Sequence, residues 1–211
     1  PGGSGQVGQV IAGHFHRQGH EVVVLSRDPQ PAPWRSAHWD GRTLGAWEQE
    51  LNGADVVIGL AGKNVNTRYT PENQRQIMAS RLDATQALGE AIAGCQRPPR
   101  LWLQASTATI YAHTFGPAHD ESGPLGGGEP GAPAKWDFSV EVAKAWEQAT
   151  LAADTPHTRR VLLRSALIMD PAPGGIFDTL MTFVRLGLSG PPAGGRQYVS
   201  WVHDQDFIRI L

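Results

Sequence analysis

The sequence contains one cysteine, Cys95, in 211 residues, so no disulfide can form within the chain. No charge of one sign is in excess, because 18 lysines and arginines are interspersed with 20 aspartates and glutamates for a net charge of -2. Without a basic cluster, the surface lacks the charge that nucleic acids and anionic lipids require of a partner. No apolar run reaches the length of a membrane span, and no signal peptide is recognisable. These absences favour a cytoplasmic protein that binds small molecules rather than nucleic acid or membrane.

What the sequence does contain is a regular alternation of helix and strand patterns. A chain of this length with 40% hydrophobic residues can bury one substantial core. Short, almost continuously apolar runs alternate with segments of helical periodicity, which is typical of a parallel sheet covered on both faces. The pattern predicts strands at 22–25, 56–60, 101–105 and 161–168, and helices at 7–18, 44–51, 71–92, 137–152 and 174–186. The predicted fold class is therefore α/β, a doubly wound parallel sheet of the Rossmann type.

The remaining stretches are predicted to be irregular. Proline recurs in residues 28–42, and glycine and proline dominate residues 113–135, which predicts a long loop over the edge of the sheet. The chain opens inside a glycine-rich turn, although a dinucleotide fold has a buried strand before that turn, and it closes on the start of a helical pattern. We therefore expect a chain truncated at both ends. Residues 1–168 would form a Rossmann domain without its first strand, and 169–211 would begin a small substrate-side portion packed on the same domain.

A Gly-x-x-Gly-x-x-Gly pattern spans Gly2–Gly8, directly before the first predicted helix. Glycines allow the backbone to turn sharply and to approach a pyrophosphate, and the helix N-terminus offers free N–H groups to the phosphates. A tight turn without a ligand is the alternative, but the helix and the apolar strand that follow at the right distance favour a cofactor site. The predicted cofactor contacts come from Gly2, Gly5, Gln6, Val7 and Gly8.

The end of the second predicted strand bears on the choice of cofactor. An acidic residue there would accept the ribose hydroxyls of NAD, whereas Ser26 and Arg27 offer a hydroxyl and a guanidinium to a 2′-phosphate. NADP is therefore the favoured cofactor. NAD stays open as the alternative, because Asp28 is one residue away from the predicted ribose position.

Distinctive short blocks are spread along almost the whole chain. They are Gly2–Gly8, Leu25–Arg27, Ala54–Gly62, Ser80–Arg81, Ala105–Tyr111, Leu163–Arg164, Gly174–Gly175 and Gly195–His203. The last block is the most specific, because its Gly-Arg-Gln-aromatic-x-Ser-Trp-x-His order has no simple compositional explanation. With these blocks the sequence resembles the atypical branch of the extended short-chain dehydrogenases, the "epimerase family" or cell-division-inhibitor-like group of NAD(P)-binding Rossmann proteins.

The resemblance implies further site residues. It assigns Leu60, Ala61 and Gly62 to the adenine side of the cofactor, and Ser106 and Tyr111 to the surroundings of the nicotinamide. Three positions depart from the family pattern. Asparagine is common where Gly59 stands, a Tyr-Gly pair is typical where this chain has Tyr111-Ala112, and Gln6 replaces the usual aromatic residue of the phosphate turn.

The catalytic pair of the wider superfamily is missing. There, a tyrosine acts as general acid or base beside a lysine one helical turn later. No tyrosine of this chain has a lysine four residues later, and the positions expected for the pair hold Phe138 and Val142. Ser106 and Tyr111 are the remaining catalytic candidates, with Lys144 a weaker one. Histidine spacing near the N-terminus does not fit a zinc site, so no metal is predicted.

These patterns leave two main functions open. The first is an NADP(H)-binding oxidoreductase or epimerase-like enzyme that acts on an unknown small substrate with Ser106 and Tyr111 as its catalytic residues. The second is a non-catalytic dinucleotide-sensing or protein-interaction module, with a second copy of the chain among its candidate partners. The missing pair supports the second function, as do Trp34, Trp39 and Trp136, which the sequence suggests are exposed. A sugar-nucleotide epimerase of the usual type is third, because it requires the absent pair and a substrate lobe.

Overall fold

The computed structural model describes residues 1–191, 195 and 198–211. Arg196 and Gln197, which belong to the most specific sequence block, lie outside the described residues. The elements follow in the order α1 (Gln6–Arg17), β1 (Val23–Ser26), β2 (Arg35–His38), η1 (Ala46–Glu50), β3 (Val56–Gly59), α2 (Pro71–Ala93), β4 (Leu101–Ala105), η2 (Ala108–Ile110), α3 (Ala134–Ala152), β5 (Arg159–Leu163), β6 (Leu167–Met169), α4 (Ile176–Arg185), β7 (Trp201–His203) and α5 (Asp204–Ile210).

Every strand pair in the described part of the chain is parallel, which confirms the predicted fold class. β1 pairs with β2, β4 lies between β3 and β5, and β6 pairs with β7. The first two groups are connected through the start of the chain. Gly2 N–H donates to Leu25 O at 3.2 Å, and Leu60 N–H donates to Pro1 O at 3.0 Å. The backbone of these two N-terminal residues therefore lies between β1 and the end of β3.

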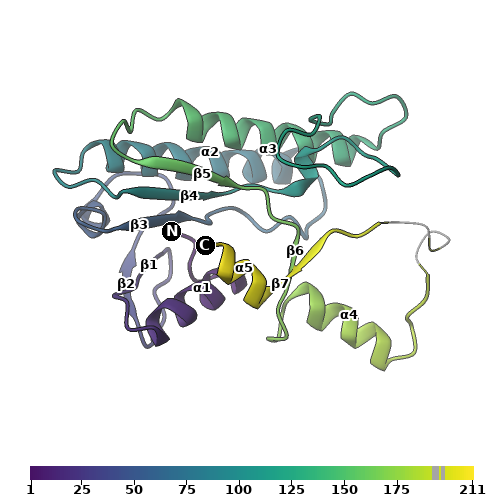
Figure 1. The fold of residues 1–211 in the computed structure, drawn as a ribbon, viewed down its shortest axis with the longest axis horizontal. Helices are drawn as coiled ribbons and strands as arrows, with labels where there is room; N and C mark the ends of the chain where they lie inside the picture. Colours follow the sequence, from purple (N-terminus) through teal and green to yellow (C-terminus); the bar gives the residue numbers. More distant parts are fainter. Residues whose placement is uncertain (192–194, 196–197) are drawn as a thin grey trace.

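Helices cover both faces of this sheet (Figure 1). α2 and α3 lie on one side, where Val57 and Trp102 pack in a cluster with Leu88 of α2. α1 and α5 lie on the other side, where Ile58 packs with Ile11 and Phe207. Consecutive residues of β3 thus point into opposite layers, as alternation along a strand requires. The sheet is doubly wound, with an apolar layer on each face.

The segment 28–42 was predicted to be irregular, and this prediction is wrong at its centre. Arg35–His38 forms β2, with its register against β1 running from Val23 opposite Arg35 to Ser26 opposite His38. No apolar run marks this strand in the sequence, because it lies beside β1 at the outer edge of its sheet and only its backbone is needed for pairing. Backbone pairing with β1, rather than a pattern in its own side chains, makes this segment a strand.

The predicted strand at 161–168 is two strands. β5 ends at Leu163, where its partner β4 also ends at Ala105, so the sheet offers no further backbone partners. The chain turns aside, with Ser165 N–H donating to Leu163 O at 2.8 Å. It then forms β6, which pairs with β7 instead. The continuous apolar character of the segment therefore hides a change of sheet.

The start of α3 also differs from the prediction. The helix was predicted to begin at residue 137, but it begins three residues earlier, after Pro133. The Asp137 carboxylate accepts the N–H of Gly128 at 3.0 Å and so holds the preceding loop against the first helical turn. The boundary predicted at residue 168 between domain and substrate-side portion stays a prediction. None of the helices described is both long enough and apolar enough to cross a membrane.

Candidate cofactor and active site

Two glycines of the turn before α1 are required by its fold. Gly2 has φ +74°, and a Cβ on it would lie 2.7 Å from Ala61 N and from the carbonyl carbon of Leu60. A Cβ on Gly8 would lie 2.6 Å from the carbonyl carbon of Gly3. The turn therefore presses against the end of β3 and folds back on itself, which only glycine permits at these two positions.

Gly5 differs from these two glycines, because the space above it is open. It is the N-cap of α1, it is exposed, and a Cβ on it would meet only Gly2 O at 3.5 Å. Among the described residues no side chain caps this helix, and its first turn holds no acidic residue. The N–H groups and the positive end of the helix dipole therefore face open space, a cradle that fits the pyrophosphate of a dinucleotide.

The structure engages Gln6 and Val7 in packing as well. Gln6 Nε2 donates to Asp170 Oδ2 at 3.3 Å, and Gly175 leaves room for this side chain, since a Cβ there would lie 2.6 Å from Gln6 Cδ. Val7 packs against the cluster around Phe207. The glutamine that replaces the usual aromatic residue thus ties the phosphate turn to the segment after β6. Contact of either residue with a cofactor stays a prediction.

Ser26 at the end of β1 is joined to the glycine turn. Its hydroxyl lies 3.2 Å from Ser4 Oγ and accepts the N–H of Asp28 at 3.2 Å. Ser26 is buried, whereas the side chain of Arg27 is exposed beside it. The arrangement fixes the bend after β1 and leaves the Arg27 guanidinium free to meet a ligand.

The segment Leu60–Gly62 lines the other side of the turn. Leu60 and Ala61 lie against Gly2. A Cβ on Gly62 would lie 3.1 Å from the guanidinium carbon of Arg81. Arg81 donates to Lys63 O and Ile77 O, and burial lowers its pKa. The predicted adenine-side residues and the predicted phosphate turn are therefore direct neighbours.

The departure at Gly59 has a physical reason. A Cβ at Gly59 would lie 2.9 Å from Cδ of Gln104, a buried residue of the adjacent strand β4. Gln104 Nε2 donates to Gly59 O at 3.2 Å and its Oε1 accepts the indole N–H of Trp102 at 3.0 Å. The polar side chain that the family pattern has at this position is here supplied by the neighbouring strand.

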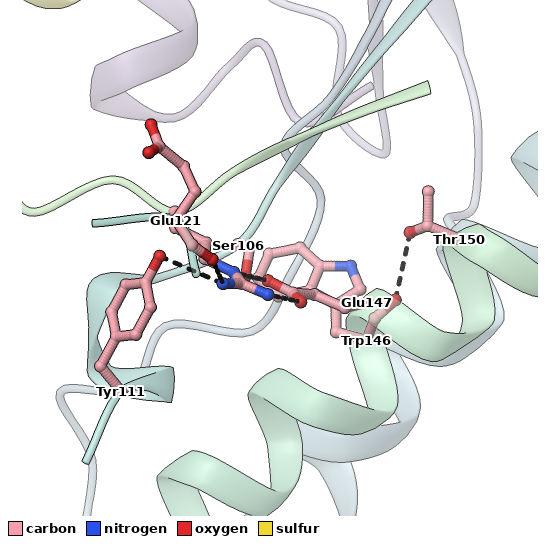
Figure 2. Close-up of polar contacts among 7 residues, drawn as sticks. Ser106, Tyr111, Glu121, Trp146, Glu147 and Thr150 are labelled. Carbon is pink, nitrogen blue, oxygen red and sulfur yellow. Dashed lines mark hydrogen bonds and ion pairs between the residues drawn. The ribbon is translucent and has the colours of Figure 1, made fainter. Parts of the chain in front are cut away.

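Ser106 follows β4 directly and belongs to a buried polar network (Figure 2). Its hydroxyl donates to Glu147 Oε1 of α3 at 2.6 Å. Arg164, the first residue after β5, donates to the same carboxylate with Nε and Nη2, both at 2.8 Å. The Glu147 side chain is 8% exposed and that of Arg164 is 22% exposed. The carboxylate therefore accepts three charge-assisted hydrogen bonds in a mostly buried position.

Tyr111 joins the network through the third guanidinium nitrogen. Arg164 Nη1 donates to Tyr111 Oη at 3.1 Å and to Glu121 O at 3.2 Å. Figure 2 shows the Tyr111 hydroxyl directed toward this contact, with the Glu121 carboxylate pointing away. The ring of His119 lies 5.8 Å from that of Tyr111. The tyrosine of the predicted site is thus held by a cation from the segment that follows β5.

The network changes the pKa values of Glu147 and Arg164. Burial raises the pKa of Glu147, but the hydrogen bonds from Arg164 and Ser106 and the charge of Arg164 outweigh burial and leave that pKa below its usual 4.5. The hydrogen bond to Glu147 in turn raises the pKa of Arg164. Both groups are therefore charged throughout the neutral range.

The structure brings the two predicted catalytic residues, Ser106 and Tyr111, into one network, and it adds two residues that the sequence reasoning missed. Leu163–Arg164 was among the resembling blocks, yet nothing local assigned its arginine a role. Glu147 carries no signal in the sequence, because an acidic residue on a helix usually faces solvent. The catalytic roles themselves stay predictions.

The residues at the expected positions of the missing pair pack elsewhere. Phe138 makes an edge-to-face contact with Tyr69 at 5.8 Å, and Val142 is buried. Lys144 donates to Gly126 O at 2.5 Å and so supports the long loop. None of these three side chains belongs to the Ser106 network.

The tryptophans that were expected to be exposed are not. Trp39 is 2% exposed and packs against Trp47, while Trp34 and Trp136 are half-buried. The prediction is wrong for Trp39 because this ring packs in one buried cluster with Trp47 and Leu51, contacts that are not visible in the sequence. Among the described residues, no three histidine, cysteine or carboxylate side chains group as metal ligands.

Comparison with known proteins gives matches over the whole chain. The sequence model of the NAD dependent epimerase/dehydratase family matches residues 1–211. Epimerase family protein SDR39U1 from Bos taurus is 33% identical over 214 residues, and the match covers 100% of this chain and 67% of that protein. The chain thus spans about two thirds of the length of this curated relative.

Solved structures give a similar result. The crystal structure of human epimerase family protein SDR39U1 with NADPH has a TM-score of 0.82 and 29% identity, over 98% of this chain and 65% of that one. The nucleoside-diphosphate sugar epimerase from Corynebacterium glutamicum has a TM-score of 0.78 and 27% identity, over 99% of this chain and 41% of that one.

Proposed function

This chain belongs to the NAD dependent epimerase/dehydratase family, and we propose that it binds NADP(H) in the turn before α1 and acts as an oxidoreductase on a small substrate. The observation that carries the proposal is the open, uncapped N-terminus of α1 above Gly5. A tightly folded glycine turn with free N–H groups has a direct use in holding a pyrophosphate. Gly2, Gln6, Val7 and Gly8 would shape this cradle, with Leu60–Gly62 beside the adenine.

The surroundings of Arg27 support NADP over NAD. Ser26 is fixed by Ser4 and Asp28, so the exposed guanidinium of Arg27 starts from a defined position beside the turn. A planar guanidinium matches a phosphate in both charge and shape. The related human structure contains NADPH, which agrees with this choice. NAD is the alternative if Asp28 turns toward the ribose.

The chemistry would take place at the carboxyl edge of the sheet. A bound nicotinamide supplies or accepts a hydride. Tyr111 would exchange a proton with the oxygen of the substrate, because its hydroxyl lies at this edge and is already positioned. Ser106 donates a hydrogen bond to Glu147 and would act by holding that carboxylate in place.

A non-catalytic dinucleotide sensor is the second candidate. The absence of a Tyr-x-x-x-Lys pair favours it, because the superfamily's usual proton donor is missing. The burial of Trp39 removes part of its support, since that ring is not available to a protein partner. A homodimer remains a proposal for either function.

Binding of NADPH and NADH, followed by the fluorescence of the reduced nicotinamide, tests the proposed site. Gly5→Val fills the open space without a clash inside the turn, so we expect NADPH affinity to fall by about 100-fold or more while the unfolding midpoint barely changes. Gly13→Ala in the same helix is the matched control, since its Cβ meets only the flexible end of Arg17 closely. Equal NADPH affinity in Gly5→Val and Gly13→Ala would refute the site.

Arg27→Ala tests the choice of cofactor. Loss of one charge-assisted contact with a phosphate predicts about 10-fold weaker NADPH binding with NADH binding unchanged. Arg209→Ala on α5 removes the same charge at another exposed position and controls for overall electrostatics. A screen of NADPH oxidation with aldehydes and ketones then separates enzyme from sensor: tight binding without turnover of any of them would favour the sensor.

A further inference from the structure

Tyr111 accepts a hydrogen bond from a group that can only donate. A guanidinium has five N–H donors and no acceptor, so the phenolic hydrogen of Tyr111 cannot be given to Arg164. It must point away from the guanidinium, toward another acceptor or a ligand. The oxygen of the Tyr111 hydroxyl is therefore held beside a positive charge, and its hydrogen is available for donation to a ligand.

This hydroxyl lies on the edge of the sheet where a ligand of an α/β fold binds. β3, β4 and β5 end at Gly59, Ala105 and Leu163, within one residue of each other in the sheet, and the Ser106 network follows directly from the last two. The glycine turn touches the chain just after the end of β3. The carboxyl ends of parallel strands thus place Tyr111 and the phosphate cradle along one edge.

We propose that Arg164 is the positioning residue that takes the place of the absent lysine and holds Tyr111 as the proton donor to a carbonyl substrate. The inference rests on the proposed function for its cofactor. In the reducing direction the carbonyl carbon of an aldehyde or ketone accepts a hydride from the reduced cofactor, and its oxygen accepts the Tyr111 proton. The C=O π bond breaks, C–H and O–H bonds form, and the phenolate remains beside the guanidinium until water returns the proton.

Glu147 and Ser106 have a supporting role in this arrangement. The bidentate contact fixes the plane of the guanidinium, so that Nη1 alone is left to face Tyr111. Ser106 fixes the carboxylate in turn. The negative charge of Glu147 also weakens the field of Arg164 at the phenol oxygen. Removal of the Arg164 charge should therefore move the ionisation of Tyr111 to higher pH, and removal of the Glu147 charge should move it to lower pH.

The other groups around Tyr111 are few. His119 from the long loop lies beside the ring, with its Nε2 3.1 Å from Ala112 O. Glu121 contributes its backbone carbonyl, and Lys144 of α3 donates to Gly126 O, behind the backbone of Tyr111. Arg164 and Glu147 are therefore the charges whose removal tests the coupling.

The test follows ionisation of the tyrosines by NMR of the full chain labelled with 13C-tyrosine. The three signals belong to Tyr69, Tyr111 and Tyr198, and Tyr111→Phe identifies the one of interest. Arg164→Met combined with Glu147→Gln removes the cation without leaving a buried charge. We expect the Tyr111 transition to move to higher pH than in the parent chain, because the cation that contacts its oxygen is gone. With Arg164→Lys in place of Arg164→Met, the Tyr111 transition should return toward its position in the parent chain.

Glu147→Gln alone provides the second arm, because it keeps Arg164 and should move the Tyr111 transition to lower pH. Arg160→Gln is the matched control: this arginine lies on β5, the strand that Arg164 follows, binds the backbone carbonyls at the end of α3, and should leave Tyr111 unmoved. Tyr198, which is 77% exposed, should keep its transition in every variant.

A folded Arg164→Met/Glu147→Gln chain whose Tyr111 titrates as in the parent would overturn the proposal. If that variant does not fold, an unmoved transition in Glu147→Gln would overturn it equally. These measurements need no cofactor, so they are separate from a failure of NADPH binding, which would overturn the proposed function but not the Arg164–Tyr111 coupling.

Discussion

The glycine turn and the Ser106 network lie at the same edge of the sheet but are built in opposite ways. The turn is a continuous stretch, Gly2–Gly8, whose geometry depends on its own backbone and on one neighbouring strand end. The network joins four side chains that follow β4, η2 and β5 or stand on α3. A continuous site can lose one contact and keep its shape, whereas a buried network of charges fails as a unit. The two regions should therefore respond differently to substitution.

Arg164→Ala should have the largest effect on stability. It leaves the Glu147 carboxylate buried without its cation, which costs about 3 kcal/mol, the low end for breaking a buried pair because Arg164 keeps partial exposure. Urea denaturation would show this as a lower midpoint with an unchanged slope. Arg35→Ala, which breaks an exposed pair with Glu50, is the control and should change the midpoint far less. Similar losses in both variants would contradict the distinction.

Within the turn, Gly8→Ala and Gly5→Ala sharpen the comparison at a smaller scale. The methyl group at Gly8 would overlap the backbone of Gly3, and such overpacking costs roughly 1–3 kcal/mol. The methyl group at Gly5 enters open space, so its effect on stability should stay within about 0.5 kcal/mol. Thermal unfolding of the two variants separates the glycine needed by the fold from the one left to the ligand. Equal losses of stability would mean that the turn is packed throughout.

The smallest effect is a dependence of stability on pH. The folded state holds the pKa of Glu147 below its usual 4.5, so the unfolded chain binds more protons between the two values. The stabilisation by this group is therefore complete above pH 4.5 and is lost as the pH falls through the lowered value. The gap in unfolding free energy between the parent and Glu147→Gln should be constant at neutral pH and should shrink in acid. A gap that widens in acid would reverse the assigned direction.

Much of the fold could be predicted because its central elements carry their own pattern. The strands at 56–60 and 101–105 and the helix at 71–92 agree with β3, β4 and α2 to within a residue. Each carries buried apolar residues in its own pattern, Val57 in β3, Trp102 in β4 and Leu88 in α2, so hydrophobic periodicity marks them. β2 was missed because Arg35–His38 has no apolar alternation and depends on β1 for its ladder.

The candidate site likewise has one part that the sequence marks and another part that it does not. Gly2, Gly5 and Gly8 could be found from spacing, because the turn and the helix that it precedes are contiguous. Glu147 could not, since nothing in its neighbourhood distinguishes it from a solvated helix residue until Ser106 and Arg164 are placed beside it. The partner of Tyr111 was sought four residues along the chain and is instead Arg164, which follows β5.

By itself, the sequence determined the alternation of strands and helices, the parallel sheet and the glycine turn, because periodicity and backbone freedom are properties of neighbouring residues. Only the tertiary structure decided which charges meet at the carboxyl edge of that sheet. The reason is that parallel strands bring their ends together whatever the length of chain between them, so Ser106, Tyr111 and Arg164 become neighbours, with Glu147 reaching in from α3, through topology rather than spacing.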